Sequence, residues 1–390
     1  MSTQTSLRPP FGSLESAQRL SFESPSATAL CAILVVVATV TLRPALSVAE
    51  VPRGVFSMGQ TGGRPSDNVL ENPDVTGVTI RWNWADIERT EGNFFWDDLD
   101  DVIQLATDAN KKVLLRISTQ AGKPDWVTQA VADAGGSFFT FDDNGVTTTI
   151  PVFWDPTFLK KKTNMIAALG AHYASNLTIA IVSASFANAT SEDWNVPHSP
   201  YDLVQEWLDL GYTPKNLEDA GEQIINATMT AFPTQYVSLA INGSGPDLDK
   251  DFCDTLKNTC VAATAVDYAN TTWPGRLVVQ IDSLSACNPP TPGPDDRAWN
   301  LLWNSQPNVA AQMVDNVYDE PNYRANCGSP GLDTAILMGC VTQGSLYGVE
   351  YVEIYETDVR HLPVAITYTH NLLRLARWIP PGPIPPARSP

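Results

Sequence analysis

The sequence predicts an α/β protein, a single (β/α)₈ barrel (a TIM barrel) with long loops after its third and fourth strands. Three observations predict this fold. Eight short runs of apolar or β-branched residues recur along the chain, helical patterns lie between most of them, and no linker divides them. Strands that alternate with helices indicate a parallel sheet, and eight such units favour its closure into a barrel.

The runs that predict the strands are 53–58, 77–83, 112–118, 178–186, 236–241, 276–282, 308–314 and 349–355. Helical patterns cover 97–110, 158–175, 217–231, 332–347 and 365–379. A doubly wound sheet is the alternative fold, but it usually carries a glycine-rich phosphate loop that opens a helix after the first strand. Here that loop reads GQTGGRPSDN, and its glycines open no convincing helix. The barrel is therefore the preferred prediction.

The composition is strongly acidic. The 390 residues hold 24 Lys and Arg against 43 Asp and Glu, a net charge of −19. Such a surface repels phosphate backbones and anionic membranes, which argues against nucleic acid as a partner. Neutral ligands such as saccharides are not disfavoured, and we expect a monomer with an oligosaccharide or polysaccharide as its partner.

Residues 1–49 are predicted to be a targeting segment, 50–378 the barrel, and 379–390 a proline-rich disordered tail. The uncharged run from Ala29 to Leu42 is short for a membrane span and resembles the apolar part of a signal peptide. Small residues before position 50 suggest cleavage after Ala49 and a secreted or extracytoplasmic protein. A membrane anchor through 29–42 is the alternative, and membrane association is expected only if this segment is not cleaved.

The cysteines agree with export. Cys31 lies in the apolar run, which leaves five in the barrel. The preferred pairing is 253–260 and 287–327, with Cys340 unpaired in a helix, although sequence alone does not fix connectivity. No cysteine or histidine spacing indicates a zinc site, so neither a metal nor a cofactor is expected.

Two long connections follow predicted strands, from 119 to 154 and from 187 to about 214. Both follow the carboxyl ends of their strands, where barrel enzymes keep their sites. Both are rich in aromatic residues, which we interpret as walls of a cleft. The residues are Trp126, Phe138, Phe139, Phe141, Phe153, Trp154, Trp194, Tyr201 and Trp207.

Residues 78–117 carry the most specific pattern. The stretch VTIRWNWADIERTEGNFFWDDLDDVIQLATDANKKVLLRI resembles the second and third strands of barrel-clan glycoside hydrolases, a clan that includes the family 42 and family 5 enzymes. Residues 151–188 also look like these enzymes. The matching residues of the first stretch are Arg81, Trp84, Ile87, Glu88, Glu91, Gly92, Phe95, Trp96, Leu99 and Asp100. The resemblance implies a barrel fold and hydrolysis of O-glycosidic bonds, and within it we interpret Glu88 and Glu91 as loop anchors.

Glycoside cleavage uses two carboxyl groups, one to protonate the leaving oxygen and one to attack the sugar or activate water. The clan places the acid at the end of strand 4, directly after an Asn, and the nucleophile at the end of strand 7. Here Asn188 is followed by Ala189, and the nearest acid is Glu192. We predict that Glu192 is the catalytic acid; the alternative is an ordinary acidic loop with Asp193.

The seventh strand has no glutamate, so the second carboxylate is sought on the eighth. Because side chains alternate across a strand, Tyr351, Glu353 and Tyr355 would face the barrel axis. A buried glutamate requires a partner. The structural interpretation pairs Glu353 with Arg81; the functional interpretation makes Glu353 the second catalytic carboxylate. Acids farther out that could replace it are Asp315, Glu356 and Asp358.

Sugar-binding candidates surround these carboxylates. Gln312 is the only polar residue inside the seventh strand and would suit hydrogen bonding to a sugar hydroxyl, and aromatic side chains in loops suit stacking on flat apolar faces. The candidates are Arg81, Trp84 (or its neighbour Trp82), Trp126, Asn188, Trp194, Gln312 and Tyr355. Taken singly, each of the aromatic residues is more often a core residue than a ligand.

Other catalytic classes lack a pattern. The sequence contains no G-x-S-x-G elbow and no phosphate-binding P-loop. Two further interpretations stay open: a barrel that binds saccharide without cleaving it, and a cell-surface interaction protein anchored by its N-terminal segment.

Overall fold

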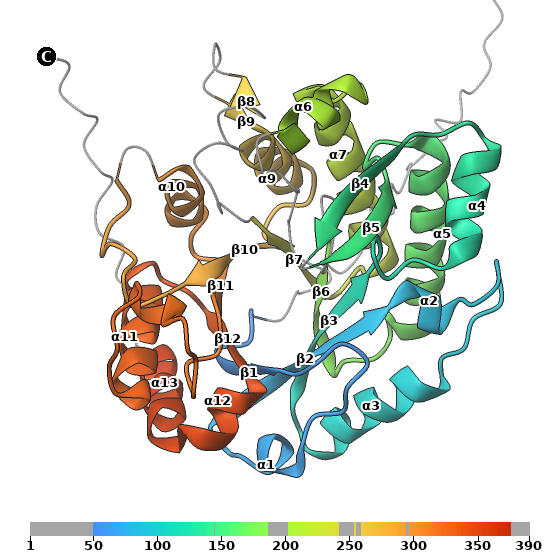
Figure 1. The fold of residues 1–390 in the computed structure, drawn as a ribbon. Helices are drawn as coiled ribbons and strands as arrows, with labels where there is room; N and C mark the ends of the chain where they lie inside the picture. Colours follow the sequence, from blue (N-terminus) through green and yellow to red (C-terminus); the bar gives the residue numbers. More distant parts are fainter. Residues whose placement is uncertain are drawn as a thin grey trace, which may run out of the picture. The chain divides into compact units, whose positions relative to one another are not determined.

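The structure is a computed structural model that describes residues 50–143, 145–185, 202–241, 253–254, 259–293 and 296–375. Eight parallel strands close into a barrel in the order β1–β12–β11–β10–β7–β6–β3–β2 (Figure 1). Their bounds are β1 (Gly54–Met58), β2 (Val75–Asn83), β3 (Lys112–Ser118), β6 (Ile179–Ser183), β7 (Tyr236–Ala240), β10 (Leu277–Leu284), β11 (Val309–Met313) and β12 (Tyr351–Tyr355). Each predicted strand is one of these eight, and the predicted barrel is confirmed.

Helices surround the barrel on its outside (Figure 1). The five predicted helices correspond to α3 (Asp97–Asp108), α5 (Pro156–Tyr173), α7 (Pro214–Ala231), α11 (Asp333–Leu346) and α13 (Pro363–Leu375). Elements that were not predicted are α1 (Asp67–Leu70), α2 (Trp84–Ile87), α4 (Asp125–Asp133), α6 (Asp202–Asp209), α9 (Val261–Thr272), α10 (Arg297–Asn304), α12 (Glu356–His361), the 3₁₀ turn Arg324–Asn326, and two hairpins, β4 (Phe138–Asp143) with β5 (Val146–Pro151) and β8 (Cys253–Asp254) with β9 (Thr259–Cys260).

Local sequence explains where the helices begin. The Asp155 carboxylate accepts a hydrogen bond from the Phe158 amide at 2.8 Å and caps α5, whose first residue is a proline. Helix α3 has three aspartates in its first turn, where the positive end of the helix dipole favours them. Its predicted apolar face is buried against the barrel.

The inside of the barrel has two levels. The lower level, towards the amino ends of the strands, is apolar. It consists of Val51, Phe56, Leu114, Ile181, Tyr236, Val278, Ala310 and Tyr351. Gly77 also belongs to β2, and a Cβ atom there would lie 2.5 Å from the Phe56 ring, so only glycine fits beside this side chain. The upper level, towards the carboxyl ends, is polar and forms the candidate site below.

Among the residues that the structure describes, no helix combines the length and the apolar character that crossing a membrane requires. The predicted targeting segment (1–49) and the whole of the predicted tail (379–390), with residues 376–378 before it, lie outside the described residues.

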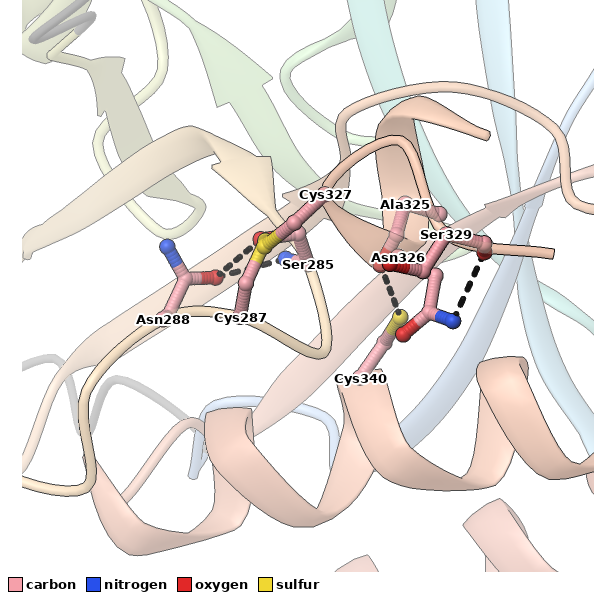
Figure 2. The surroundings of a disulfide bond; sticks show 8 residues. All are labelled: Ser285, Cys287, Asn288, Ala325, Asn326, Cys327, Ser329 and Cys340. Atoms are coloured by element: carbon pink, nitrogen blue, oxygen red, sulfur yellow. Dashed lines mark hydrogen bonds between the residues drawn. A yellow bond between two sulfur atoms is a disulfide. The ribbon is translucent and has the colours of Figure 1, made fainter. Parts of the chain in front are cut away.

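A disulfide joins Cys287, in the loop after β10, to Cys327, in the loop after β11 (Figure 2). This pairing was predicted and is confirmed, as is the unpaired Cys340 within α11, which is buried. Hairpin β8–β9 sets Cys253 opposite Cys260 in its register. Their side chains lie outside the described part of the chain, so the 253–260 disulfide stays a prediction.

Removing the Cys287–Cys327 disulfide is expected to destabilise the barrel. The bridge closes a loop across a sequence separation of 40 residues, which restricts the unfolded chain. We expect the double substitution Cys287→Ser/Cys327→Ser to lower the free energy of unfolding by about 3 kcal/mol. Urea denaturation under oxidising conditions measures this, and a change below about 0.5 kcal/mol would contradict the prediction.

Candidate active site

Polar side chains from five strands meet inside the upper level of the barrel, and we call this group the axial network. Its members are Thr79 (β2), Arg116 (β3), Gln280 (β10), Gln312 (β11) and Glu353 (β12). All five are buried. Buried polar groups are tolerated when they are hydrogen-bonded, and each of these side chains binds at least one other member.

Glu353 is the centre of the axial network and has no exposed surface. One carboxylate oxygen accepts a hydrogen bond from the Thr79 hydroxyl. The other accepts from the Arg116 guanidinium and, at 2.5 Å, from the Gln280 amide. The prediction that Glu353 faces the barrel axis is confirmed. With donors on both oxygens and no exposed surface, this carboxylate holds its neighbours in place.

The structure shows an ion pair between Glu353 and Arg116 of β3. Arg116 is the in-register neighbour of Arg81 on β2, so the two arginines lie side by side on adjacent strands. The predicted pairing of Glu353 with Arg81 stays a prediction.

Gln280 has a fixed orientation within this network. Burial raises the pKa of the Tyr351 phenol well above its ordinary value, so the hydroxyl stays protonated and donates to Gln280 Oε1 at 2.9 Å. The amide nitrogen of Gln280 must therefore point the other way, towards acceptors. It donates to Glu353 and also to Asp282 Oδ1, at 2.9 Å.

Asp282 was not predicted as a site residue. It follows Gln280 by two positions on β10 and is 8% exposed. The register between β10 and β11 shifts between Ile281 and Leu284, so Asp282 lies at an irregularity of the strand. Such irregularities redirect side chains and are common beside active sites. The sequence held a signal for this residue, because Gln280 and Asp282 are alternate polar residues that follow the apolar run 277–279.

Three predicted sugar ligands lie on barrel strands at axis-facing positions. Gln312 belongs to the axial network, and its Oε1 accepts from Arg116 at 3.0 Å. Arg81 follows Thr79 by two residues, and Tyr355 follows Glu353 by two residues; both are half-buried. The structure thus brings Arg81, Gln312 and Tyr355 to the same end of the barrel as Asp282.

The other two described candidates lie elsewhere. Trp84 of α2 is wholly buried, donates to the Glu88 carboxylate at 2.6 Å, and meets Trp126 edge to face at 5.9 Å. The indole of Trp126 donates to the Glu88 carbonyl at 3.0 Å. Glu88 also accepts from the Gly92 amide at 2.8 Å, as a loop anchor would. This cluster supports the loop after β2, and Trp84 has no exposed face to offer a sugar.

Three aromatic residues of the long connections pack into the core. Trp207 of α6 stacks on Phe139 of hairpin β4–β5 at 3.8 Å and on Phe153 at 5.1 Å. All three rings are buried in the main hydrophobic core. The interpretation as cleft walls is therefore wrong for these three residues.

The predicted acid Glu192, with Asn188 and Trp194, lies outside the described residues. The described chain leads up to this segment at Ser185, just after β6. The Ser185 carbonyl accepts a hydrogen bond from the Nζ of Lys162, a wholly buried residue of α5. Burial lowers the pKa of Lys162 to about 7. The amine therefore anchors the end of β6 from the outside of the barrel.

The alternative second carboxylates have partners of their own. Asp315 forms an ion pair with Arg324 at 3.1 Å. Glu356 accepts from the Ser66 amide at 3.2 Å. Asp358 is buried, which raises its pKa to about 6, and it accepts from the amides of Val317 and Tyr318. These contacts tie loops together at the carboxyl end of the barrel.

Within the described ranges, no group of three or more His, Cys, Asp or Glu side chains is placed to hold a metal ion.

The model of glycoside hydrolase family 42, described as beta-galactosidase, matches residues 68–219. This span is less than half of the chain and includes both stretches that carry the predicted resemblance. No curated protein sequence is recognisably similar to the chain.

Solved structures extend the likeness to the fold. The chain is similar to the beta-galactosidase of the psychrophilic Marinomonas ef1, with 12% identity, a TM-score of 0.50, and coverage of 82% of this chain and 59% of that one. It is also similar to the cold-adapted beta-galactosidase of Rahnella sp. R3, with 11% identity, a TM-score of 0.51, and coverage of 85% and 58%. The chain spans less than two thirds of the length of either. The resemblance to barrel-clan glycoside hydrolases is thus confirmed by the family match and by the fold.

Proposed function

We propose that this protein hydrolyses O-glycosidic bonds at the carboxyl end of its barrel. The observation that carries the proposal is the axial network. A barrel core is normally filled with apolar side chains, whereas this one holds a buried carboxylate, an arginine and two amides at the end where barrel enzymes bind substrate. The match to a glycoside hydrolase family over residues 68–219 supports the same reaction class.

The described residues have distinct roles in this proposal. Arg81, Gln312 and Tyr355 bind hydroxyl groups or faces of a sugar, because they lie at axis-facing positions near the mouth. Arg116 and Glu353 hold them in register from below. Glu192 is proposed as the acid that protonates the leaving oxygen. The saccharide is neutral, as the charge of −19 on the chain favours.

The test is the release of reducing sugar from a panel of aryl glycosides and polysaccharides, headed by β-galactosides because of the family description. Wild type and Glu192→Gln are compared. General acid catalysis contributes at least about a hundredfold, so we expect the variant to lose at least that factor in kcat/KM on natural leaving groups. Glu71→Gln, an exposed glutamate at the opposite end of the barrel, is the control and is expected to match wild type.

Release that persists undiminished in Glu192→Gln would contradict the assignment of the acid, while the proposal of a hydrolase would stand. Release by no variant from any substrate would contradict the hydrolase itself.

A barrel that binds saccharide without cleaving it is the second candidate. The observation that favours it is β11, where Val309–Met313 contains no acid at the strand that carries the nucleophile in the clan. The complete burial of Glu353 also favours a barrel that binds without cleaving, because an enclosed carboxylate does not contact a substrate. Binding of a panel sugar by calorimetry, together with no release by wild type, is the result that this candidate predicts.

A further inference from the structure

We infer that Asp282 is the second catalytic carboxylate of this barrel, the one that faces the anomeric carbon. The inference rests on the proposed hydrolase function and names a residue for it on the sixth barrel strand, β10. Three observations support this role: the position of Asp282, its hydrogen-bonded link to the axial network, and the contacts of the other acids that could take its place.

Position is the first argument. Asp282 follows Gln280 by two residues on β10, so both side chains lie on the face of the strand that points into the barrel. Gln280 is wholly buried within the axial network, and Asp282 is the next residue towards the carboxyl end, 8% exposed. Asp282 therefore lies one inward-facing position nearer the mouth of the barrel than Gln280, whereas Glu353 is wholly enclosed.

The link to Glu353 is the second argument. The amide nitrogen of Gln280 donates to Asp282 Oδ1 at 2.9 Å and to Glu353 Oε2 at 2.5 Å. These two carboxylate oxygens are therefore separated by no more than the sum of the two distances. Nearby like charges would disfavour ionisation of both groups, and Arg116 offsets this by neutralising Glu353.

The competing acids supply the third argument. Asp315 pairs with Arg324, Glu356 accepts from the Ser66 amide, and Asp358 is buried against two backbone amides. Each of these carboxylates holds a loop. Asp282 accepts a hydrogen bond from Gln280, a residue inside the barrel.

In the proposed step, Asp282 either forms a bond to the anomeric carbon itself or takes a proton from a water whose oxygen forms that bond. The bond from the anomeric carbon to the leaving oxygen breaks, its electron pair goes to that oxygen, and the proton of the acid is transferred there. If a glycosyl–Asp282 ester forms, water then displaces the carboxylate and gives its proton to the former acid. The anomer released first, followed by NMR, distinguishes the two routes.

The experiment compares wild type with Asp282→Asn on the substrate that wild type cleaves best. Asparagine keeps the size of the side chain and removes the charge. We expect kcat/KM to fall at least a hundredfold while saccharide binding, measured by calorimetry, and the thermal midpoint stay close to wild type. Asp219→Asn, on the exposed surface of α7, is the charge-matched control and is expected to keep full activity. Asp315→Asn is measured beside it, because Asp315 is an alternative second carboxylate.

Two further measurements keep the inference falsifiable. Asp282→Glu retains the charge, and if Asp282→Asn fails to fold we expect Asp282→Glu to fold and to cleave at least tenfold more slowly than wild type. In Asp282→Ala, added formate or azide is expected to restore turnover, which a purely structural role would not produce.

Unchanged cleavage by Asp282→Asn or Asp282→Glu, or loss in Asp315→Asn alone, would overturn the role of Asp282 and leave the hydrolase intact. Absence of cleavage by wild type would overturn both.

Discussion

Replacing Arg116 with methionine is expected to lower the free energy of unfolding by about 3–5 kcal/mol, because it leaves the Glu353 carboxylate buried without its cation. Arg116 is 1% exposed and Glu353 is wholly buried, so water cannot take the place of the guanidinium. Gln312 would lose the donor to its Oε1 as well. Urea denaturation followed by tryptophan fluorescence measures the change.

The matched control for this prediction is Arg324→Met. Arg324 also forms an ion pair with a carboxylate, Asp315, but the two side chains are 57% and 26% exposed. Exposed pairs contribute little, so we expect a loss of no more than about 1 kcal/mol. An Arg116→Met variant that is no less stable than Arg324→Met would show that the axial pair does not need its cation.

The double substitution Arg116→Met/Glu353→Leu separates the loss of the pair from the cost of an unpaired charge. Replacing both partners with apolar groups removes the isolated carboxylate, so we expect the double variant to be more stable than Arg116→Met alone by about 2 kcal/mol or more. Strictly additive losses would contradict this explanation.

The barrel could be predicted from the sequence because its strands are apolar runs bounded by turns. The strand at 112–118 is recovered with the same bounds. The strand at 77–83 begins two residues earlier than predicted, and the strand at 276–282 begins one residue later and ends two residues later. Parallel strands buried on both faces give the strongest sequence signal of this kind. The sequence did not predict helices α9 and α10 or the hairpin β4–β5. Tertiary contacts, such as the stack of Phe139 on Trp207, stabilise such elements and cannot be recognised from local sequence.

The site could be predicted only in part. The alternation of side chains along 349–355 correctly predicted that Glu353 faces the barrel axis. It does not predict how far each strand is shifted relative to its neighbours. The ion pair between Glu353 and Arg116 was therefore not predicted. Trp84 illustrates a second limit: its place in the motif does not reveal that the Glu88 carboxylate holds its indole within the core.

Replacing Lys162 with methionine is expected to make the protein more stable at pH 7, by an amount that disappears at alkaline pH. Lys162 is wholly buried in α5, and burial lowers its pKa from 10.5 to about 7. Between these two values the unfolded chain binds a proton that the folded chain does not. The stability of wild type therefore rises as the pH increases from 7 to 10.5, by about 4 kcal/mol from this group.

Below pH 7 both states carry the proton, so the contribution of Lys162 no longer changes. Methionine fills a similar volume without a charge. It loses the hydrogen bond to the Ser185 carbonyl, about 1 kcal/mol, and the contact between the amine and the Phe158 ring. The advantage of Lys162→Met at pH 7 is then on the order of 3 kcal/mol. Lys160→Met, an exposed lysine of the same helix, is the control and is expected to change stability by no more than about 0.5 kcal/mol at any pH.

Urea denaturation of the three proteins at pH 7, 8.5 and 10 tests this directly. A difference between wild type and Lys162→Met that does not shrink with rising pH would mean that Lys162 stays charged in the folded protein. Since the amine anchors the carbonyl at the end of β6, the same variants link stability to function. Reduced cleavage in Lys162→Met, with higher stability, is the result expected if β6 must be held in place for the segment that carries Glu192. In that case a buried amine is retained at a cost in stability because it positions the site.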